Sequence, residues 1–554
     1  MQHRNSSPTA VAILRYLLWV AGAVLAMAMI ANEAKAQTLT PSVGTSPSAA
    51  TMSFDEARHL LNRTSFAAQP SEIAAFTKIT RANAVDQLLA QTRRQAAFPA
   101  PEWTKIYERP YRTDMTPEQR QEVQKREMVV RALELRTWWT AEMLATPTPL
   151  TEKMTLFWHN HFATSQQKVR VAQLMYRQNV LLRQHALGNF SVMLREVAKD
   201  PAMLIYLDGT QNKKGAPNEN FAREVMELFT LGQGNYSEQD IREVARAFTG
   251  WSNDADIGEF RFRRAAHDEG TKTIFGHTGK FNGDDVITLL LKRDETSEFI
   301  VGKLWLEFVS PEPNVAEVKR IARVWREAGY ENKPMLRALL LSDDFWAAKN
   351  RAVLVKSPVE LVVGSLRQFK FEVEDPAPFA VIMRQLGQDL FGPPNVKGWP
   401  GGDAWLNTTT LLARKGFLNR LFRADEMGQP VSAATLIDRD LMGQQRDKAR
   451  ARLATVGVWN DKHDSNEVKA AGDMMSASKT DSMKAPTSGI GTNNNLKGQY
   501  FFDSAKWLGQ YPNQSDADML WKTLLAGPPV QATQLKYDLA GLRAIALDPM
   551  YQLK

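Results

Sequence analysis

The 554-residue sequence contains no cysteine. This absence excludes disulfide bonds, a lipid anchor on cysteine and any zinc site that depends on thiolates. An exported protein of this size can hold itself together with its core, and the apolar fraction of 44% is normal for a soluble globular protein. Length alone favours two to four structural units.

Several signature motifs are also missing. The sequence has no Gly-x-Ser-x-Gly elbow, no Walker loop and no dinucleotide fingerprint. It has no long basic run and no nucleic-acid-binding motif, so we expect no nucleic-acid partner. We also expect no cofactor and no bound metal.

An export signal is predicted at the N-terminus. The apolar run "YLLWVAGAVLAMAMIA", residues 16–31, follows two arginines and precedes Ala34-Lys35-Ala36, which fits a signal-peptidase site. Cleavage after Ala36 would leave a mature chain without a transmembrane span, whereas an uncleaved anchor is the alternative. No twin arginine precedes the run, so we expect the general secretion route and a periplasmic or secreted protein. Losing residues 1–36 lowers the formal net charge from +8 to +6, which permits only weak attraction to anionic envelope polymers.

The remaining sequence predicts a mainly α-helical protein: a multi-helix globular domain with a small inserted β-hairpin and a partly disordered C-terminal extension. Helical periodicity begins at Ser53, where Glu56 three residues later completes a capping box. Residues 460–498 contain few large apolar side chains and are predicted to be disordered. The expected segments are a signal peptide (1–36), a linker (37–52), a helical domain (53–425), a helical extension (426–459), a disordered insert (460–498) and a C-terminal helical segment (499–554).

One strand signal interrupts the helices. "EFRFR", residues 259–263, alternates strictly between polar and aromatic positions. Its expected partner is "KTIFG", residues 272–276, across the connection "RAAHDEGT".

The stretch "FWHNHFATS", residues 157–165, raises the question of a nuclease or metal site. A helix starting at Thr148 and Pro149 would place His159 and His161 about 160° apart, so the two cannot bind one ion. The nuclease signature spreads its residues over tens of positions and does not match. We expect His161 to lie among aromatic residues with a hydrogen bond. His159, on the other side, is either a site residue or solvated surface.

A polar stripe marks the helix predicted at 218–231. Asn220, Arg223, Glu224 and Glu227 lie on one face of it. Glu224 and Glu227 could serve as a general acid and base. The alternative is an ion-paired face or a buried structural network, because Arg223 is spaced to pair with either Glu219 or Glu227. Arg246 lies on the next helix, away from its buried stripe.

Two further segments carry candidate residues. His267 and Asp268 are adjacent in the expected hairpin turn, where an Asp can orient a His or both can simply bind backbone. In the loop "PPNVKGWPGGDAW", Lys397 and Trp399 would suit a sugar-like ligand if exposed, whereas burial over the core is the alternative.

The chain resembles a known family at seven segments in one order. These segments are "HLLNRTSF", "LTEKMTLFWHNHFATS", "PNENFAREVMELFTLG", "ARAFTGW", "HDEGTKTIFG", "VKSPVELVVG" and "PPNVKGWPGG". Together they resemble large bacterial proteins catalogued as domain of unknown function 1800, over about residues 53–423. The resemblance implies an exported, largely helical protein without an established activity. It also suggests a sulfatase-like exported partner, from the family catalogued as domain of unknown function 1501.

Two functions follow as hypotheses, and the sequence leaves open whether the protein is an enzyme. The favoured one is an envelope assembly protein that works with the sulfatase-like partner. The other is a hydrolase of an envelope or extracellular polysaccharide, with Glu224, Glu227, His159, His267 and Asp268 as candidate catalytic residues. An anionic or sugar-like ligand would bind Asn220, Arg246, Lys397 and Trp399. We predict that one cleft is lined by Asn220, Glu224, Arg246, His267, Asp268, Lys397 and Trp399.

Overall fold

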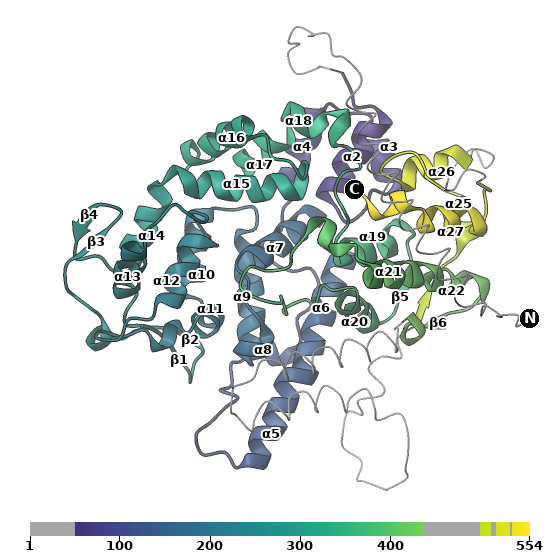
Figure 1. Cartoon of the computed structure of the whole chain (residues 1–554). Coiled ribbons are helices and arrows are strands. Elements are labelled where there is room, and N and C mark those ends of the chain that lie inside the picture. Colours follow the sequence, from purple (N-terminus) through teal and green to yellow (C-terminus); the bar gives the residue numbers. More distant parts are fainter. Residues whose placement is uncertain (1–49, 437–498, 511–516, 532–534) are drawn as a thin grey trace, which may run out of the picture.

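The computed structural model describes residues 50–436, 499–510, 517–531 and 535–554 (Figure 1). The predicted signal peptide and disordered insert lie outside the described residues. So do most of the linker and the helical extension beyond residue 436. The described residues form a mainly α-helical protein with a few short antiparallel strands, which confirms the predicted fold class.

The described chain begins with three short helices, α2 (Phe54–Thr64), α3 (Pro70–Phe76) and α4 (Arg81–Ala90). The predicted capping box is present at α2: the Glu56 N–H donates to Ser53 Oγ, and the Ser53 N–H donates to the Glu56 carboxylate. A 3-10 turn, η1 (Glu102–Thr104), follows in the long connection to α5.

A continuous helical rod then runs from the middle of the molecule to its lower end in the view of Figure 1. It consists of α5 (Pro117–Lys125), a π-helical turn η2 (Arg126–Arg131) and α6 (Ala132–Ala145). The π turn turns Glu127 inward, where its buried carboxylate accepts hydrogen bonds from Arg131 (2.6 Å) and from the Ala172 N–H (3.1 Å). The rod is therefore tied to the start of the helix that packs beside it.

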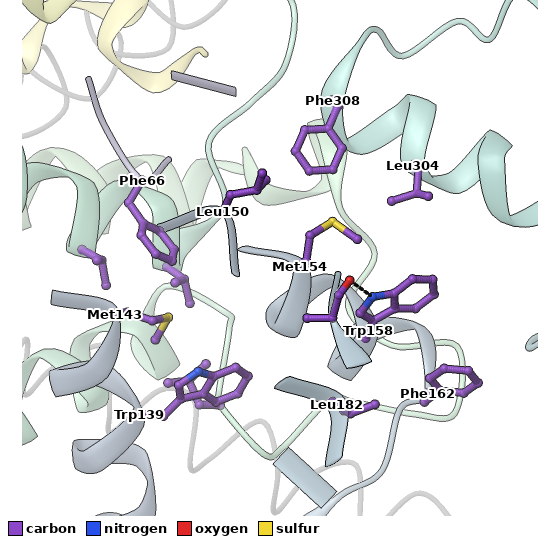
Figure 2. Packing of buried hydrophobic residues seen from close by; sticks show 14 of the residues in the cluster. Phe66, Trp139, Met143, Leu150, Met154, Trp158, Phe162, Leu182, Leu304 and Phe308 are labelled. Carbon is purple, nitrogen blue, oxygen red and sulfur yellow. Dashed lines mark hydrogen bonds between the residues drawn. The ribbon is translucent and has the colours of Figure 1, made fainter. Parts of the chain in front are cut away.

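Helix α7 (Pro149–His161) lies at the centre of the fold. Figure 2 shows its Leu150, Met154 and Trp158 packed among side chains of other elements, and Trp158 Nε1 donates to the Ala186 carbonyl (3.0 Å). The helices that follow are α8 (Gln166–Val169), α9 (Ala172–His185), α10 (Phe190–Lys199), α11 (Pro201–Tyr206) and the 3-10 turn η3 (Gly209–Gln211).

A smaller lobe holds α12 (Glu219–Glu227), α13 (Glu238–Ala247) and four strands (Figure 1). The expected hairpin pairing is wrong. β2 (Glu259–Phe262) pairs with β1 (Trp251–Asp254), whereas β3 (Lys272–Ile274) pairs with β4 (His277–Gly279). Both connections are shorter than the one we expected, so each hairpin closes at a lower cost in chain entropy. The 3-10 turn η4 (Arg264–Ala266) joins the two hairpins.

The next five helices run from the left side of the molecule to its top in the view of Figure 1. They are α14 (Gly283–Lys292), α15 (Asp294–Phe308), α16 (Val315–Glu327), α17 (Asn332–Leu340) and α18 (Asp343–Trp346), followed by the 3-10 turn η5 (Ala348–Asn350).

The last part of the chain joins segments that are distant in sequence. Its helices are α19 (Pro358–Gln368), α20 (Ala377–Gln385), α21 (Thr408–Leu421), α22 (Arg423–Glu426), α25 (Ser504–Leu508), α26 (Ala517–Leu524) and α27 (Leu539–Leu547), with the 3-10 turns η6 (Gly402–Trp405), η7 (Ala433–Leu436) and η8 (Pro549–Gln552). β7 (Gln499–Phe501) is the middle strand of a small sheet between β5 (Glu372–Val373) and β6 (Val431–Ser432). The C-terminal helical segment therefore packs back onto the main helical body, as predicted.

One large hydrophobic core connects these groups of helices, from Leu60 in α2 to Ile545 in α27. Within the part of the chain that the structure describes, no helix has both the length and the apolar character needed to cross a bilayer.

Candidate functional site

The three residues at the end of α7, His159, Asn160 and His161, contact three different parts of the fold. The helix leading to them is buried on nearly every side, including its polar residues. Glu152 accepts two hydrogen bonds from Arg183 of α9 (2.6 and 2.9 Å). The neighbouring Lys153 forms a buried ion pair with Glu360 of α19. Glu152 and Lys153 therefore connect α7 to two of the helices around it.

His159 lies in an aromatic enclosure. Its ring centroid is 5.4 Å from those of Trp139 and Phe391 and 5.6 Å from that of Trp399. The residue is 1% exposed, and neither ring nitrogen has a hydrogen-bond partner in the described residues. Burial lowers the pKa of His159 to about 3, so the imidazole is neutral at physiological pH. The expectation of solvated surface is wrong, because α7 has no solvent-facing side at this position.

Asn160 fixes the loop that carries Lys397 and Trp399. Its Oδ1 accepts a hydrogen bond from the Trp399 N–H (2.6 Å). Gly398 lies against the same amide with φ +84°, and a Cβ atom there would be 2.2 Å from Asn160 Oδ1. Only glycine fits that position without displacing the loop.

Trp399 is buried rather than presented as a stacking surface. It is 4% exposed and packs with Val355 and Trp405, and its indole Nε1 has no partner in the described residues. Lys397, two residues earlier, is exposed and forms no ion pair with any described residue. The loop thus buries its tryptophans and holds Lys397 outward on a fixed backbone.

His161 links α7 to the end of α12 and to α15. Its Nε2 lies 3.2 Å from the Phe229 carbonyl, and its Nδ1 lies 3.2 Å from Lys303 Nζ. The Lys303 ammonium also donates to the Leu228 carbonyl (3.3 Å). Burial, reinforced by the charge of Lys303, holds the pKa of His161 well below its usual value. His161 therefore lies among aromatic rings with a hydrogen bond, as the sequence predicts.

The carboxylates of α12 have different surroundings. Glu227 accepts a hydrogen bond from the Tyr236 hydroxyl (2.6 Å), whereas the half-buried Glu224 has no hydrogen bond or ion pair with any described residue. Burial and then the charge of Glu227 raise the pKa of Glu224, and the charge of Lys397 acts in the opposite direction. Glu224 and Lys397 are therefore close enough to interact electrostatically. Arg223 pairs with Glu219 and Glu238 rather than with Glu227.

Asn220 lies near the start of α12. Its side-chain amide donates to Asp208 Oδ2 (3.4 Å), and the same carboxylate forms an ion pair with Lys168 (2.8 Å). Its backbone N–H donates to the capping residue Asn218 (3.0 Å). Asn220 thus helps to join α12 to the turn after α11.

A second group of candidates lies around the end of α13. Arg246 binds Asp268 through two nitrogens (2.8 and 3.3 Å) and also donates to Glu243 (2.8 Å). The hydrogen bond from Arg246 holds the pKa of Asp268 at about 2. His267 Nδ1 lies 2.9 Å from the Thr249 carbonyl. These contacts hold the segment before β3 against α13.

The candidate residues therefore form two groups, one around Glu224, Glu227 and Lys397 and one around Arg246, His267 and Asp268. Among the described residues, no hydrogen bond or ion pair joins one group to the other. Their meeting in one cleft stays a prediction, as do the catalytic and ligand-binding roles. Among those same residues, no group of three or more histidines and carboxylates is arranged to hold a metal ion.

The sequence analysis missed the residues that hold the site together. Asn160 and Gly398 form a contact between segments that are more than 200 positions apart, and Lys303 comes from a helix without a distinctive motif. The position of Asn160 between two histidines was a signal that could have identified it. Tyr236, whose hydroxyl binds Glu227, follows α12 closely, so the sequence could also have identified it as a neighbour of Glu227.

Comparison with known proteins gives a family. The model of a family described as a protein of unknown function, DUF1800, matches residues 59–497, and the chain belongs to this family. The match covers most of the chain and continues beyond residue 423, where the motif resemblance ends. No curated protein and no solved structure matches the chain.

Proposed function

We propose that this member of the DUF1800 family is an exported envelope protein that acts by assembly with a second exported protein. The proposed partner is sulfatase-like, as the family resemblance suggests. The proposed location is the periplasm or the cell exterior, reached through the general secretion route after cleavage at Ala36. The observation that supports a non-catalytic role is that four of the five candidate catalytic residues, all except Glu224, make contacts that hold the fold together.

A general acid or base needs contact with substrate and a second protonation state within reach. His159 has neither, because it is enclosed by aromatic rings and stays neutral down to about pH 3. Asp268 is held ionised by Arg246, and His267 lies against the Thr249 carbonyl. Glu227 is engaged by Tyr236. These contacts position helices and loops, which is the work expected of a rigid binding scaffold.

The proposed contact surface is the exposed part of the loop between α20 and α21. Pro394, Asn395, Lys397 and Pro400 are exposed there, while Gly398 and Trp399 anchor the loop to α7. A fixed, exposed loop loses little conformational entropy when it binds, which favours a docking role. Lys397 supplies a cation for an acidic group on the partner.

A tagged chain purified from envelope extract tests this proposal. We expect it to recover the sulfatase-like protein reproducibly, and Lys397→Glu to reduce that recovery at least fivefold. Lys280→Glu, at an exposed lysine after β4, is the matched control and should retain recovery. Absence of a reproducible partner, or equal recovery with Lys397→Glu, would overturn the proposal.

A hydrolase of an envelope or extracellular polysaccharide is the second candidate, and one observation favours it. Glu224 is half-buried without a hydrogen-bond partner, and burial beside Glu227 raises its pKa, which suits a general acid. Glu224→Gln should then abolish release of reducing ends from a polysaccharide substrate, while leaving the thermal midpoint unchanged. Full biological activity in both Glu224→Gln and Glu227→Gln would exclude this candidate.

A further inference from the structure

A groove lies between α9, α10 and the β1–β2 hairpin, and none of the candidate site residues named above lines it. Its volume is about 360 Å³, within the range of small-ligand pockets. Its walls include Arg177 and Leu181 from α9, Arg195 and Lys199 from α10, Pro201 at the start of α11, and Phe260 from β2.

Two arginines of the groove are held in place by neutral acceptors. Arg177 donates to the carbonyls of Gly258 (2.9 Å) and Ile257 (3.3 Å). Arg195 donates to the Asp284 carbonyl (3.2 Å) and to Thr288 Oγ1 (2.9 Å). Neither guanidinium forms an ion pair with a carboxylate of the described residues. Each is therefore positioned without being neutralised, as in sites that bind a carboxylate, sulfate or phosphate.

Lys199 adds a third cation beside an aromatic surface. Its ammonium lies 2.7 and 2.9 Å from the oxygens of Asp284, and over the rings of Trp251 (5.3 Å) and Phe260 (5.8 Å). Leu181, Pro201 and Phe260 give the groove an apolar part next to these charges. The apolar face of a sugar ring packs well on such a surface.

The groove also contains acceptors. Glu196 and Glu259 are exposed carboxylates of its lining, and Glu196 binds His185 (2.9 Å). Asp200 is buried and accepts hydrogen bonds from Gln178 (2.7 Å) and from the Met203 N–H (2.9 Å). Burial raises the pKa of Asp200 to about 7, so it carries only part of a negative charge at neutral pH.

The combination of arginines, carboxylates and apolar side chains in the groove fits one class of ligand. A simple inorganic anion would use the arginines but would be repelled by the carboxylates and would leave the apolar part uncovered. A neutral sugar would leave the arginines without an anion. An acidic sugar satisfies all three, because it has an anionic group, hydroxyl donors for the carboxylates and an apolar ring face. We propose that this groove binds an acidic sugar unit, a pyranose ring carrying a carboxylate, sulfate or phosphate.

Titration calorimetry on the whole chain tests the assignment. The probes are glucuronate, glucose 6-sulfate and glucose 6-phosphate, which distinguish the three anionic groups, with glucose and inorganic sulfate as controls. We expect at least one acidic sugar to bind at least tenfold more tightly than either control, and more weakly as salt increases. Equal affinity for inorganic sulfate, or binding of no acidic sugar, would overturn the proposal.

Variants place the binding in the groove. Arg195→Met should weaken it at least tenfold, and Arg323→Met, at an exposed arginine of α16, should leave it unchanged. Because Arg195 also ties α10 to the start of α14, Leu181→Trp provides a second variant, which fills the groove without removing a hydrogen bond. Unchanged binding in folded Leu181→Trp would contradict the assignment. Lys397→Glu should keep full affinity, so the groove and the proposed partner surface can fail independently.

Discussion

The backbone N–H of Trp399 donates a 2.6 Å hydrogen bond to the side-chain oxygen of Asn160, across 239 positions of sequence. This contact joins two of the most distinctive motifs of the chain, the end of α7 and the loop "PPNVKGWPGG". It gives the histidine-asparagine-histidine segment a structural role, in which each of the three residues holds a different neighbour of α7. A metal ion or a nuclease reaction is not needed to explain the motif.

The first prediction concerns Gly398. Gly398→Ala should destabilise the protein by at least about 2 kcal/mol, because the new methyl group would overlap Asn160 Oδ1 at a positive φ. Gly329→Ala, just after α16, is the matched control, since Gly329 also has a positive φ (+63°) but no atom within 4 Å of the added Cβ. The control should lose only about 1 kcal/mol. Urea denaturation of both variants measures the difference, and equal losses would show that the loop does not rest on Asn160.

The second prediction separates the two histidines of α7. His159→Phe and His161→Phe add the same volume at buried positions, but only His161 has hydrogen-bond partners. His161→Phe should therefore be the less stable variant by about 1–3 kcal/mol, because it leaves the Phe229 carbonyl without its partner and removes one of the two acceptors of Lys303. Denaturant midpoints give the comparison. A larger loss at His159 would mean that its ring nitrogens have partners after all.

The third prediction is a pH dependence of stability. In the folded protein burial lowers the pKa of His159 from 6.5 to about 3, whereas in the unfolded chain it returns to its usual value. Below pH 6.5 His159 therefore binds a proton in the unfolded state but not in the folded state. The free energy of unfolding falls as the pH decreases towards 3. Each pH unit in this window costs ~1.4 kcal/mol for this histidine. The free energy of unfolding of His159→Phe should fall less steeply with acid than that of the natural protein, and parallel curves would contradict the assignment.

The fourth prediction concerns the buried ion network of α7. Glu360 forms ion pairs with Lys153 and Lys554, and all three side chains are nearly inaccessible to solvent. Glu360→Leu should cost about 3–5 kcal/mol, because it removes the buried counter-charge that the two ammonium groups share. Only Glu307 then remains, with its carboxylate 3.9 Å from Lys153 and 2.9 Å from Lys554. Glu102→Leu removes the partner of Lys105 in an exposed pair and should change stability by less than about 1 kcal/mol. Thermal unfolding followed by circular dichroism distinguishes the two.

Local features of the fold were predictable from sequence because they depend on neighbouring residues. The capping box at Ser53 is present, and the alternation in residues 259–262 marks a strand. The partner of that strand was not predictable from alternation, because pairing depends on which segment closes the shorter connection. β2 pairs with β1 through a short connection, rather than with residues 272–276 through the longer one.

The position of His159 shows why the candidate site was harder to predict. Helical periodicity assumes one buried face and one solvated face. It therefore predicted different environments for the two histidines, with only His161 on the buried face. α7 is surrounded by other elements, so both histidines are buried, and Asn160 between them accepts a hydrogen bond from the Trp399 N–H. The partners of these residues come from α15, α19 and the loop before α21, and no pattern within α7 identifies them.

The contacts between α2 and α26 set an order of events during synthesis. α2 is among the first described helices to leave the ribosome, yet Arg58 donates to the carbonyls of Lys522 and Ala526, which follow 464 and 468 positions later. The central strand β7 is likewise made long after its partner β5. Because these contacts cannot form until the final segments have been translated, the nascent chain keeps part of its apolar core open to chaperones. Such a delay in folding agrees with the proposed export by the general secretion route, which takes up chains before they fold.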